Sequence, residues 1–313
     1  MNPIKDNFLE IFNSIDFARI KDHPNILIAA RFWDEERYNA AKTCYRFMRA
    51  VDDLIDEHKA ANKIITPSER IKFTAEVNNW LEMLFVPGNG DSLRKELTET
   101  IEKFRIPLWS LEAFARSMLY DINNDGFRTF KDFMEYSQGA SVAPASIFVH
   151  LNGLIREDGY YREPLFNVRE SATPCAIFSY LVHIIRDFQK DQLNNLNYFA
   201  DDLLTDYGLT RFDLKEIAYG HPPGDNFRNL IKHYLIIADE YRLKCCETIK
   251  QMRPLLEPKY QLSLEIIFNL YLLVFEKINI REGNFTTEEL NPTSEETRQR
   301  VFEIINNFVP VTK

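Results

Sequence analysis

The sequence lacks the excess of positive charge that nonspecific nucleic-acid binding requires. Its 38 lysines and arginines are outnumbered by 47 aspartates and glutamates, which gives the 313 residues a net charge of −9. A protein that binds nucleic acid without sequence specificity needs a basic surface. We therefore expect no nucleic-acid partner, although this charge balance does not exclude a phosphorylated substrate bound through a metal ion.

Cysteines are few, and none has CxxC spacing. The four cysteines are Cys44, Cys175, Cys245 and Cys246, of which the last two are adjacent. We interpret them as free thiols in a reducing compartment. Together with the next observation, this predicts a cytoplasmic protein.

No apolar run is long enough to cross a bilayer. The most apolar stretch, from Leu262 to Ile278, is interrupted by Glu265, Asn269 and Glu276. The first residues also lack the apolar core of a signal peptide. We expect no transmembrane segment, although a lipid substrate would still allow peripheral contact with a membrane surface.

Alternating strand patterns and Gly/Ser linkers are absent as well, and helical periodicity prevails along the chain. The sequence therefore predicts an all-α fold in one domain, residues 1–313, with ten or more helices. Thr66 and Thr129 are expected to cap helices, and Pro144 to kink one. The predicted helices cover residues 3–15, 25–32, 35–59, 66–86, 91–104, 107–121, 129–154, 172–191, 211–219, 227–252, 258–281 and 294–308. A surface loop is expected at 156–168.

Against this background, two aspartate-rich segments stand out. They read Arg49-Ala-Val-Asp52-Asp53-Leu-Ile-Asp56-Glu57 and Arg186-Asp187-Phe-Gln-Lys-Asp191. In each, two aspartates four residues apart share a helix face, with roughly 6 Å between their Cβ atoms. Two like charges at that distance repel by roughly 3 kcal/mol at an effective dielectric near 20. If both segments face one cavity, a divalent cation would offset this repulsion. Mg²⁺ is typically held by one or two carboxylates and by substrate phosphates, so the pattern suits binding and ionisation of a diphosphate.

Each aspartate pair continues a helix face that also carries aromatic and basic side chains. The first face consists of Tyr45, Arg49, Asp52 and Asp56, with Asp53 at its border. The second consists of Tyr180, His183, Asp187 and Asp191, with Arg186 beside Asp187. An arginine next to such a carboxylate can bridge to a phosphate through two N–H groups. The ordinary alternatives are solvated aspartates, satisfied core tyrosines and a structural histidine, but two such motifs in one helical chain favour a functional site.

These segments resemble the squalene/phytoene synthase family, the head-to-head branch of the class I trans-prenyltransferases. The similar segments are residues 23–57 with the first motif, Tyr136-Ser-Gln-Gly139-Ala-Ser-Val-Ala-Pro144, His183 to Asp191 with Tyr198, and Tyr271 to Ile278. The likeness spans roughly residues 20–280. It implies a class I isoprenoid synthase-like helical bundle with a central cavity.

The resemblance also implies an activity and assigns residues to it. Two allylic prenyl diphosphates, farnesyl or geranylgeranyl, would be condensed head to head into a squalene-, dehydrosqualene- or phytoene-like product. Mg²⁺ would lie between two carboxylate pairs, Asp52 with Asp56 and Asp187 with Asp191. The diphosphate would contact Arg49, Arg186 and His183, and the catalytic tyrosines at the reacting region would be Tyr45, Tyr136 and Tyr198. The sequence has no GxGxxG fingerprint and does not indicate whether NADPH is used.

Three departures from the family pattern keep alternatives open. His183 stands where the family usually has asparagine, Leu196 where it usually has arginine, and Ala140-Ser-Val-Ala-Pro144 where it has a Val-Ala-Gly type of run. We expect these changes to be compatible with ionisation of the prenyl diphosphate but to affect how the two prenyl chains are coupled. A first alternative is therefore a class I terpene cyclase, or prenyl transfer to a non-terpene acceptor. A second is a non-catalytic family member that acts in assembly, against which the four retained aspartates and both arginines argue.

Overall fold

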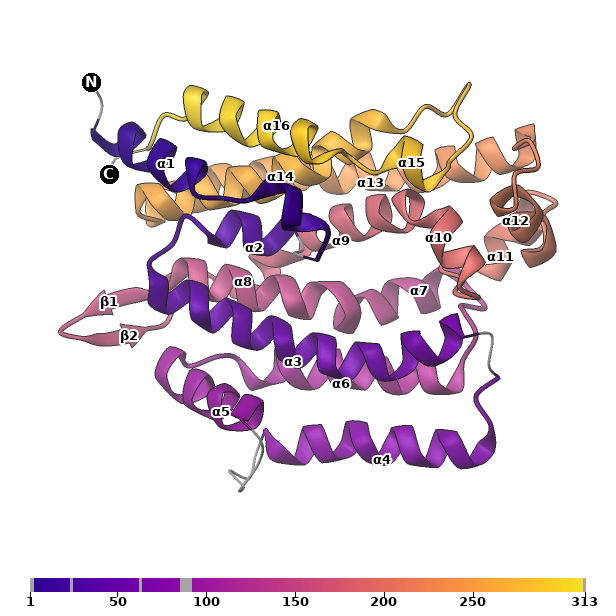
Figure 1. Ribbon diagram of the computed structural model, residues 1–313, viewed down its shortest axis with the longest axis horizontal. Helices are drawn as coiled ribbons and strands as arrows, with labels where there is room; N and C mark the ends of the chain where they lie inside the picture. The colour runs from indigo at the N-terminus through magenta and orange to yellow at the C-terminus, as the bar shows by residue number, and fades with distance from the viewer. Residues whose placement is uncertain (1–2, 23–24, 62–63, 85–91, 312–313) are drawn as a thin grey trace.

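The computed structural model describes residues 3–22, 25–61, 64–84 and 92–311. Its helices lie side by side in stacked layers, with both chain ends at the same side of the bundle (Figure 1). In chain order the elements are α1 (Pro3–Asn13), the 3₁₀ helix η1 (Phe17–Asp22), α2 (Asn25–Ala30), α3 (Glu35–Ala60), α4 (Pro67–Met83), α5 (Ser92–Phe104), α6 (Leu108–Asn123), α7 (Phe130–Ser137), the π-helix η2 (Gln138–Val142), α8 (Ala143–Gly153), β1 (Ile155–Glu157), β2 (Tyr160–Arg162), α9 (Val168–Arg186), α10 (Phe188–Leu193), α11 (Asp201–Asp206), α12 (Arg211–Ala218), α13 (Asp225–Met252), the 3₁₀ helix η3 (Arg253–Leu255), α14 (Pro258–Lys277), α15 (Thr287–Leu290) and α16 (Ser294–Asn307).

The predicted all-α fold is confirmed, and the predicted caps are present. Thr66 and Thr129 each accept a hydrogen bond from the backbone N–H three residues on, and the acidic side chain at that position accepts from the threonine N–H in return. Each such cap stabilises its helix by about 1 kcal/mol. Residues 23–24, which belong to the segment that resembles the family, lie outside the described residues.

Three of the elements that differ from the sequence-based expectation lie between residues 129 and 191. The loop expected at 156–168 contains the short antiparallel hairpin β1–β2, whose turn residues Asp158 and Gly159 both have positive φ. Strands of three residues are too short to show alternation, and such a turn suits a two-residue hairpin. The helix expected at 172–191 begins earlier, at Val168, and breaks at Asp187, which is the C-cap of α9.

The third difference concerns the helix expected at 129–154. The chain makes a π-helical turn, η2, before Pro144, which lies in the first turn of α8. Proline has no N–H and its ring clashes with the carbonyl four residues back, so the regular α-helical pattern is interrupted there. The deviation therefore precedes the proline instead of forming a simple kink at it.

The core of the bundle is rich in phenylalanine. Helix α9 packs against α13, α8 and α14, while α6 packs against α3, α4 and α8. Nine phenylalanines are among the largest fully buried side chains: Phe12, Phe32, Phe47, Phe127, Phe133, Phe178, Phe188, Phe199 and Phe227. None of the helices in the described ranges is long and apolar enough to span a membrane.

Close packing of η2 on α6 depends on Gly139. A Cβ placed on Gly139 would lie 2.4 Å from the Ala113 carbonyl oxygen and 2.9 Å from the Ser117 Cβ. We expect Gly139→Ala to lower the free energy of unfolding by about 2 kcal/mol, within the range for overpacking a core. Denaturant unfolding would measure this. Gly224→Ala is the control, because no atom lies within 4 Å of its added Cβ, and an equal loss in both variants would contradict the steric argument.

Candidate active site

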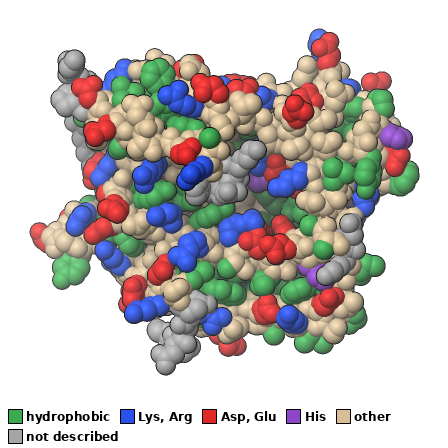
Figure 2. Space-filling model, in the orientation of Figure 1, with side chains coloured by type: hydrophobic (Ala, Val, Ile, Leu, Met, Phe, Trp, Pro, Cys, Tyr) green, Lys and Arg blue, Asp and Glu red, His purple; other side chains and the backbone are tan. Residues whose placement is uncertain are grey.

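A cavity of about 460 Å³ lies inside the helical bundle, within the size range of roughly 300–1,000 Å³ typical of ligand pockets. Helices α2, α3, α6, α8, α9, α13 and α14 all contribute to its wall. Figure 2 shows acidic, basic and histidine side chains around a hollow near the middle of this face. The central cavity expected from the sequence is therefore present.

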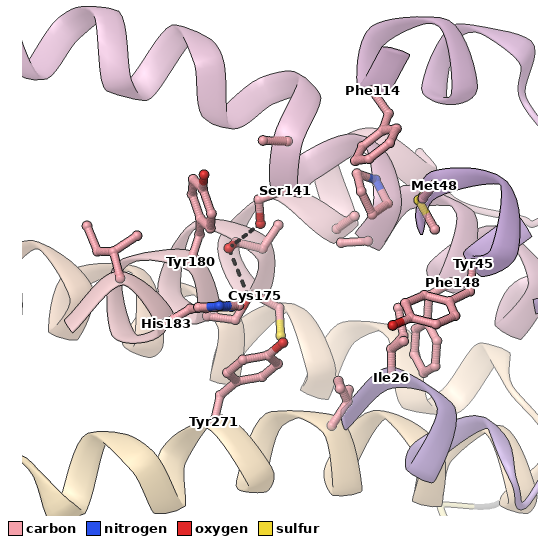
Figure 3. A pocket seen from close by; sticks show the side chains of 18 of the residues that line it. Ile26, Tyr45, Met48, Phe114, Ser141, Phe148, Cys175, Tyr180, His183 and Tyr271 are labelled. Carbon is pink, nitrogen blue, oxygen red and sulfur yellow. Dashed lines mark hydrogen bonds between the residues drawn. The ribbon is translucent and has the colours of Figure 1, made fainter. Parts of the chain in front are cut away.

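The cavity has a charged region and an apolar region. Along α3 its lining residues run from Tyr45 through Met48 to Asp52 and Asp56, a distance of about 16 Å at 1.5 Å per residue. Apolar lining side chains include Ile26, Met48, Phe114, Met118, Phe148, Val149, Leu264 and Ile267. In Figure 3, Ile26, Tyr45, Met48 and Phe148 lie across the cavity from Tyr180 and His183. A long apolar group bearing one anionic end would suit this arrangement.

The structure brings the four predicted metal-binding aspartates to this one cavity. Asp52 and Asp56 come from α3, Asp187 from the C-cap of α9, and Asp191 from α10. The Asp191 N–H donates to the Asp187 carbonyl oxygen at 2.8 Å, which keeps the two residues one helical turn apart despite the break. The two acidic rows, Asp52 with Asp56 and Asp187 with Asp191, therefore converge on one cavity, as the resemblance implies, while their metal-binding role stays a prediction.

Three of these carboxyl groups are held in an environment that disfavours their charge. Burial, with repulsion from Asp56, raises the pKa of Asp52 to about 8. Burial also raises the pKa of Asp56. The pKa of Asp191 lies well above its ordinary value, first because of burial and then because of repulsion from Asp187 and Asp56. Since Asp56 and Asp191 belong to different rows, this repulsion shows that the rows face each other closely enough to interact.

Asp187 is the exception. Its carboxylate accepts hydrogen bonds from Arg186 Nε and Nη2, both at 2.7 Å, and pairs with His183 Nε2 at 2.7 Å. Burial alone would raise the pKa of Asp187, but His183 and Arg186 outweigh it and hold that pKa well below its usual range. Arg49 is engaged similarly, with Asp52 at 2.8 Å and with Asp53. The two predicted diphosphate-binding arginines and His183 thus lie at the cavity and are already paired with carboxylates.

The donor set fits Mg²⁺ that arrives with a phosphate ligand. No group of three or more His, Cys, Asp or Glu side chains within the described ranges is arranged to hold a metal by itself. Mg²⁺ does not require such a group, because it usually keeps several waters and binds one or two carboxylates together with substrate phosphates. Asp52, Asp56 and Asp191 supply carboxylate oxygens where negative charge is in excess.

The three predicted tyrosines also line the cavity, on two sides. Tyr136 and Tyr198 belong to an aromatic wall around Tyr180, whose ring centroid lies 6.5 Å and 6.3 Å from theirs. Tyr45 lies on the opposite side, near Phe148 (Figure 3). The Tyr136 hydroxyl donates to Asp121 Oδ2 at 2.6 Å, and burial raises the pKa of Asp121 to about 7.

Two residues of interest were not predicted from the sequence. Asp121 comes from α6, and no sequence spacing relates it to either motif. Lys190 lines the cavity and was overlooked although it lies inside the second motif. The departures Leu196, Ala140 and Pro144 also line the cavity, which places them where they can affect a bound substrate.

Comparisons with known proteins agree on one family and one fold. A family model described as squalene/phytoene synthase matches residues 21–298. The chain is 24% identical over 200 residues to a chloroplastic phytoene synthase of an Oncidium hybrid cultivar, covering 64% of this chain and 45% of that protein. It is 25% identical over 179 residues to the chloroplastic phytoene synthase of Narcissus pseudonarcissus, and this match covers 57% of this chain and 40% of that protein. The match thus spans less than half the length of these curated relatives.

Solved structures share the arrangement of the whole bundle. A dehydrosqualene synthase in complex with ligand superposes with a TM-score of 0.69 at 15% identity, covering 97% of this chain and all of the other. A squalene synthase from Alicyclobacillus acidocaldarius superposes with a TM-score of 0.63 at 14% identity. This superposition covers 88% of this chain and 94% of the other. At such identities the likeness shows the fold alone, which is the isoprenoid synthase-like helical fold expected from the sequence.

Proposed function

The chain belongs to the squalene/phytoene synthase family, and from this membership we propose that it is a Mg²⁺-dependent prenyltransferase that joins two allylic prenyl diphosphates head to head. The observation that carries the proposal is the convergence of carboxylates from α3, α9 and α10 at one end of a largely apolar cavity. Farnesyl and geranylgeranyl diphosphate are the candidate substrates.

Ionisation of the first substrate is the step that the charged region suits. The allylic C–O bond breaks, and its electron pair leaves with the diphosphate. Mg²⁺, when bound to Asp52, Asp56, Asp187 and Asp191, would supply a positive charge that stabilises the leaving group. Arg49, Arg186 and His183 hold the diphosphate oxygens through N–H donors, exchanging their carboxylate partners for phosphate.

The apolar region suits the coupling step. It excludes water from the allylic cation, so that the alkene of the second prenyl chain is the available nucleophile. Tyr45, Tyr136 and Tyr198 border the reacting carbons. A proton must leave the joined chain, and the Asp121 carboxylate, hydrogen-bonded to Tyr136, is positioned to receive it through that hydroxyl.

A second candidate uses the same ionisation but a different nucleophile. Leu196, Ala140 and Pro144 depart from the family pattern and line the cavity. They would favour capture of the cation by its own chain, as in a terpene cyclase, or by a non-terpene acceptor, if they hold the second prenyl chain out of reach.

Product analysis separates these functions. We expect that incubation with farnesyl or geranylgeranyl diphosphate and Mg²⁺, with and without NADPH, yields a product with twice the carbon number of the substrate, because two chains are joined. Mass spectrometry would measure the product, and Asp52→Asn protein is the negative control. A product that keeps the substrate's carbon number supports the cyclase, and no conversion of any prenyl diphosphate contradicts prenyl transfer altogether.

A further inference from the structure

Lys190 differs from the other basic side chains that line the cavity. Arg49 is paired with Asp52 and Asp53, while Arg186 and His183 are both paired with Asp187. Lys190 lines the same cavity, and within the described part of the chain its side chain takes part in no ion pair or hydrogen bond. It is thus a cation at a site of excess negative charge whose ammonium group is still free to bind.

The surroundings of Lys190 place it between the two acidic rows. It lies in α10, directly before Asp191 and three residues after Asp187. Its positive charge acts on Asp191 and also on Asp56 of α3, and in both cases opposes the rise in pKa that burial causes. Its ammonium is therefore near carboxylates of both rows, yet farther from each than ion-pair distance.

An incoming diphosphate would meet this ammonium without breaking an existing contact. The N–H groups of Arg49, Arg186 and His183 that face aspartates must leave them before they can bind phosphate oxygens. Lys190 has nothing to give up, and lysine binds phosphate well as a compact point charge. Its exposed side chain can also rotate toward the cavity, because no contact fixes its end.

We propose that Lys190 is a diphosphate-binding residue, whose ammonium donates hydrogen bonds to diphosphate oxygens on the α10 side of the cavity. The inference rests on the proposed function, since it requires a diphosphate ligand at this place. Lys190, which does not belong to the paired Asp–Arg groups, would make the first contact with the anionic end of the substrate.

Binding of inorganic diphosphate tests this without any need for turnover. Calorimetric titration, with and without Mg²⁺, would compare wild type, Lys190→Met, Lys190→Arg and Lys232→Met. We expect Lys190→Met to weaken binding roughly tenfold to a hundredfold, the size typical of hydrogen bonds to charged groups, and Lys190→Arg to stay within a few-fold of wild type. Lys232 is exposed on α13 and does not line the cavity, so Lys232→Met should bind as wild type does.

Moving the charge provides a second measurement. Leu196 lines the same cavity, and its N–H donates to the Asp191 carbonyl oxygen at 2.8 Å, so a cation there would lie on the same side of the site. We expect Leu196→Arg to recover at least part of the affinity lost in Lys190→Met. Melting temperatures of all variants would be measured alongside, so that a loss of affinity caused by unfolding is recognised.

The outcomes distinguish this inference from the proposed function. Unchanged diphosphate affinity in Lys190→Met would overturn the inference about Lys190. If that variant also bound Mg²⁺ more tightly, the role of Lys190 would be only to offset the charge of the carboxylates. If the wild-type protein binds diphosphate through Lys190 but converts no prenyl diphosphate, the inference stands and the proposed function fails. If the wild type turns over and Lys190→Met matches it in affinity and KM, only the inference fails.

Discussion

Asp191→Asn and Asp187→Asn should each lower diphosphate release at least a hundredfold, while changing stability in opposite directions. Both substitutions remove a carboxylate that the proposed function uses, and a bound metal contributes several kcal/mol to transition-state stabilisation. The folded protein holds the two groups differently, however. The carboxylate of Asp187 is stabilised by Arg186 and His183, whereas that of Asp191 is buried beside other aspartates.

The direction of each stability change follows from the pKa shifts. The lowered pKa of Asp187 means that its charged form favours the folded state, and this contribution is present above about pH 4 and lost as the pH falls. Asparagine at this position leaves Arg186 without its ionic partner, which should cost about 3 kcal/mol. The raised pKa of Asp191 means that its charge disfavours the folded state increasingly as pH rises above about 4. Asp191→Asn should therefore raise the melting temperature.

Thermal unfolding in the presence of a chelator, at pH 5 and pH 8, would measure both effects, with diphosphate release assayed on the same preparations. The gain for Asp191→Asn should be larger at pH 8 than at pH 5. Glu57→Gln is a suitable control, because Glu57 belongs to the first acidic segment, is exposed and does not line the cavity. Equal stability changes for Asp187→Asn and Asp191→Asn would refute the difference in their environments, and full turnover in either would remove it from the mechanism.

The sequence predicted the fold well where local signals are strong. Capping threonines and long apolar periodicity located most helices within a few residues, because these signals act within a few turns. The hairpin β1–β2 and the helices α11 (Asp201–Asp206) and α15 (Thr287–Leu290) were missed, because elements this short carry little periodicity. The break at Asp187 was missed for another reason, since nothing in the sequence around it differs from a regular helix.

At the site, spacing along a helix predicted which residues share a face but not what those residues contact. Asp52, Asp56, Asp187 and Asp191 all reach the cavity, as the family resemblance implied. The sequence treated the four carboxylates as equivalent, however, and the pairing of Asp187 with Arg186 and His183 depends on side-chain conformations that spacing does not determine. Asp121 could not be found from either motif, because only the packing of α6 on α3 and α8 brings it near the site.

Chelation should abolish diphosphate release, and added Mg²⁺ should restore it. The structure also predicts how the metal binds. Within the described residues no three acidic or thiol or imidazole side chains are poised to hold a metal, so Mg²⁺ alone should bind weakly. A diphosphate supplies the missing oxygen ligands, while Mg²⁺ reduces the repulsion between the diphosphate and the acidic rows. Each ligand should therefore increase the affinity for the other by the same factor.

Thermal shifts would measure this coupling in four conditions: chelator alone, Mg²⁺, inorganic diphosphate, and both together. We expect the joint stabilisation to exceed the sum of the separate ones, and to reach about 2.7 kcal/mol when the ligand concentration is a hundredfold above Kd. Asp52→Asn should remove the excess, because that carboxylate is one of the expected metal ligands. Turnover that resists chelation would eliminate the metal from the mechanism. A full shift with Mg²⁺ alone would mean that the aspartates form a complete metal site before substrate arrives, against the geometry of the two acidic rows.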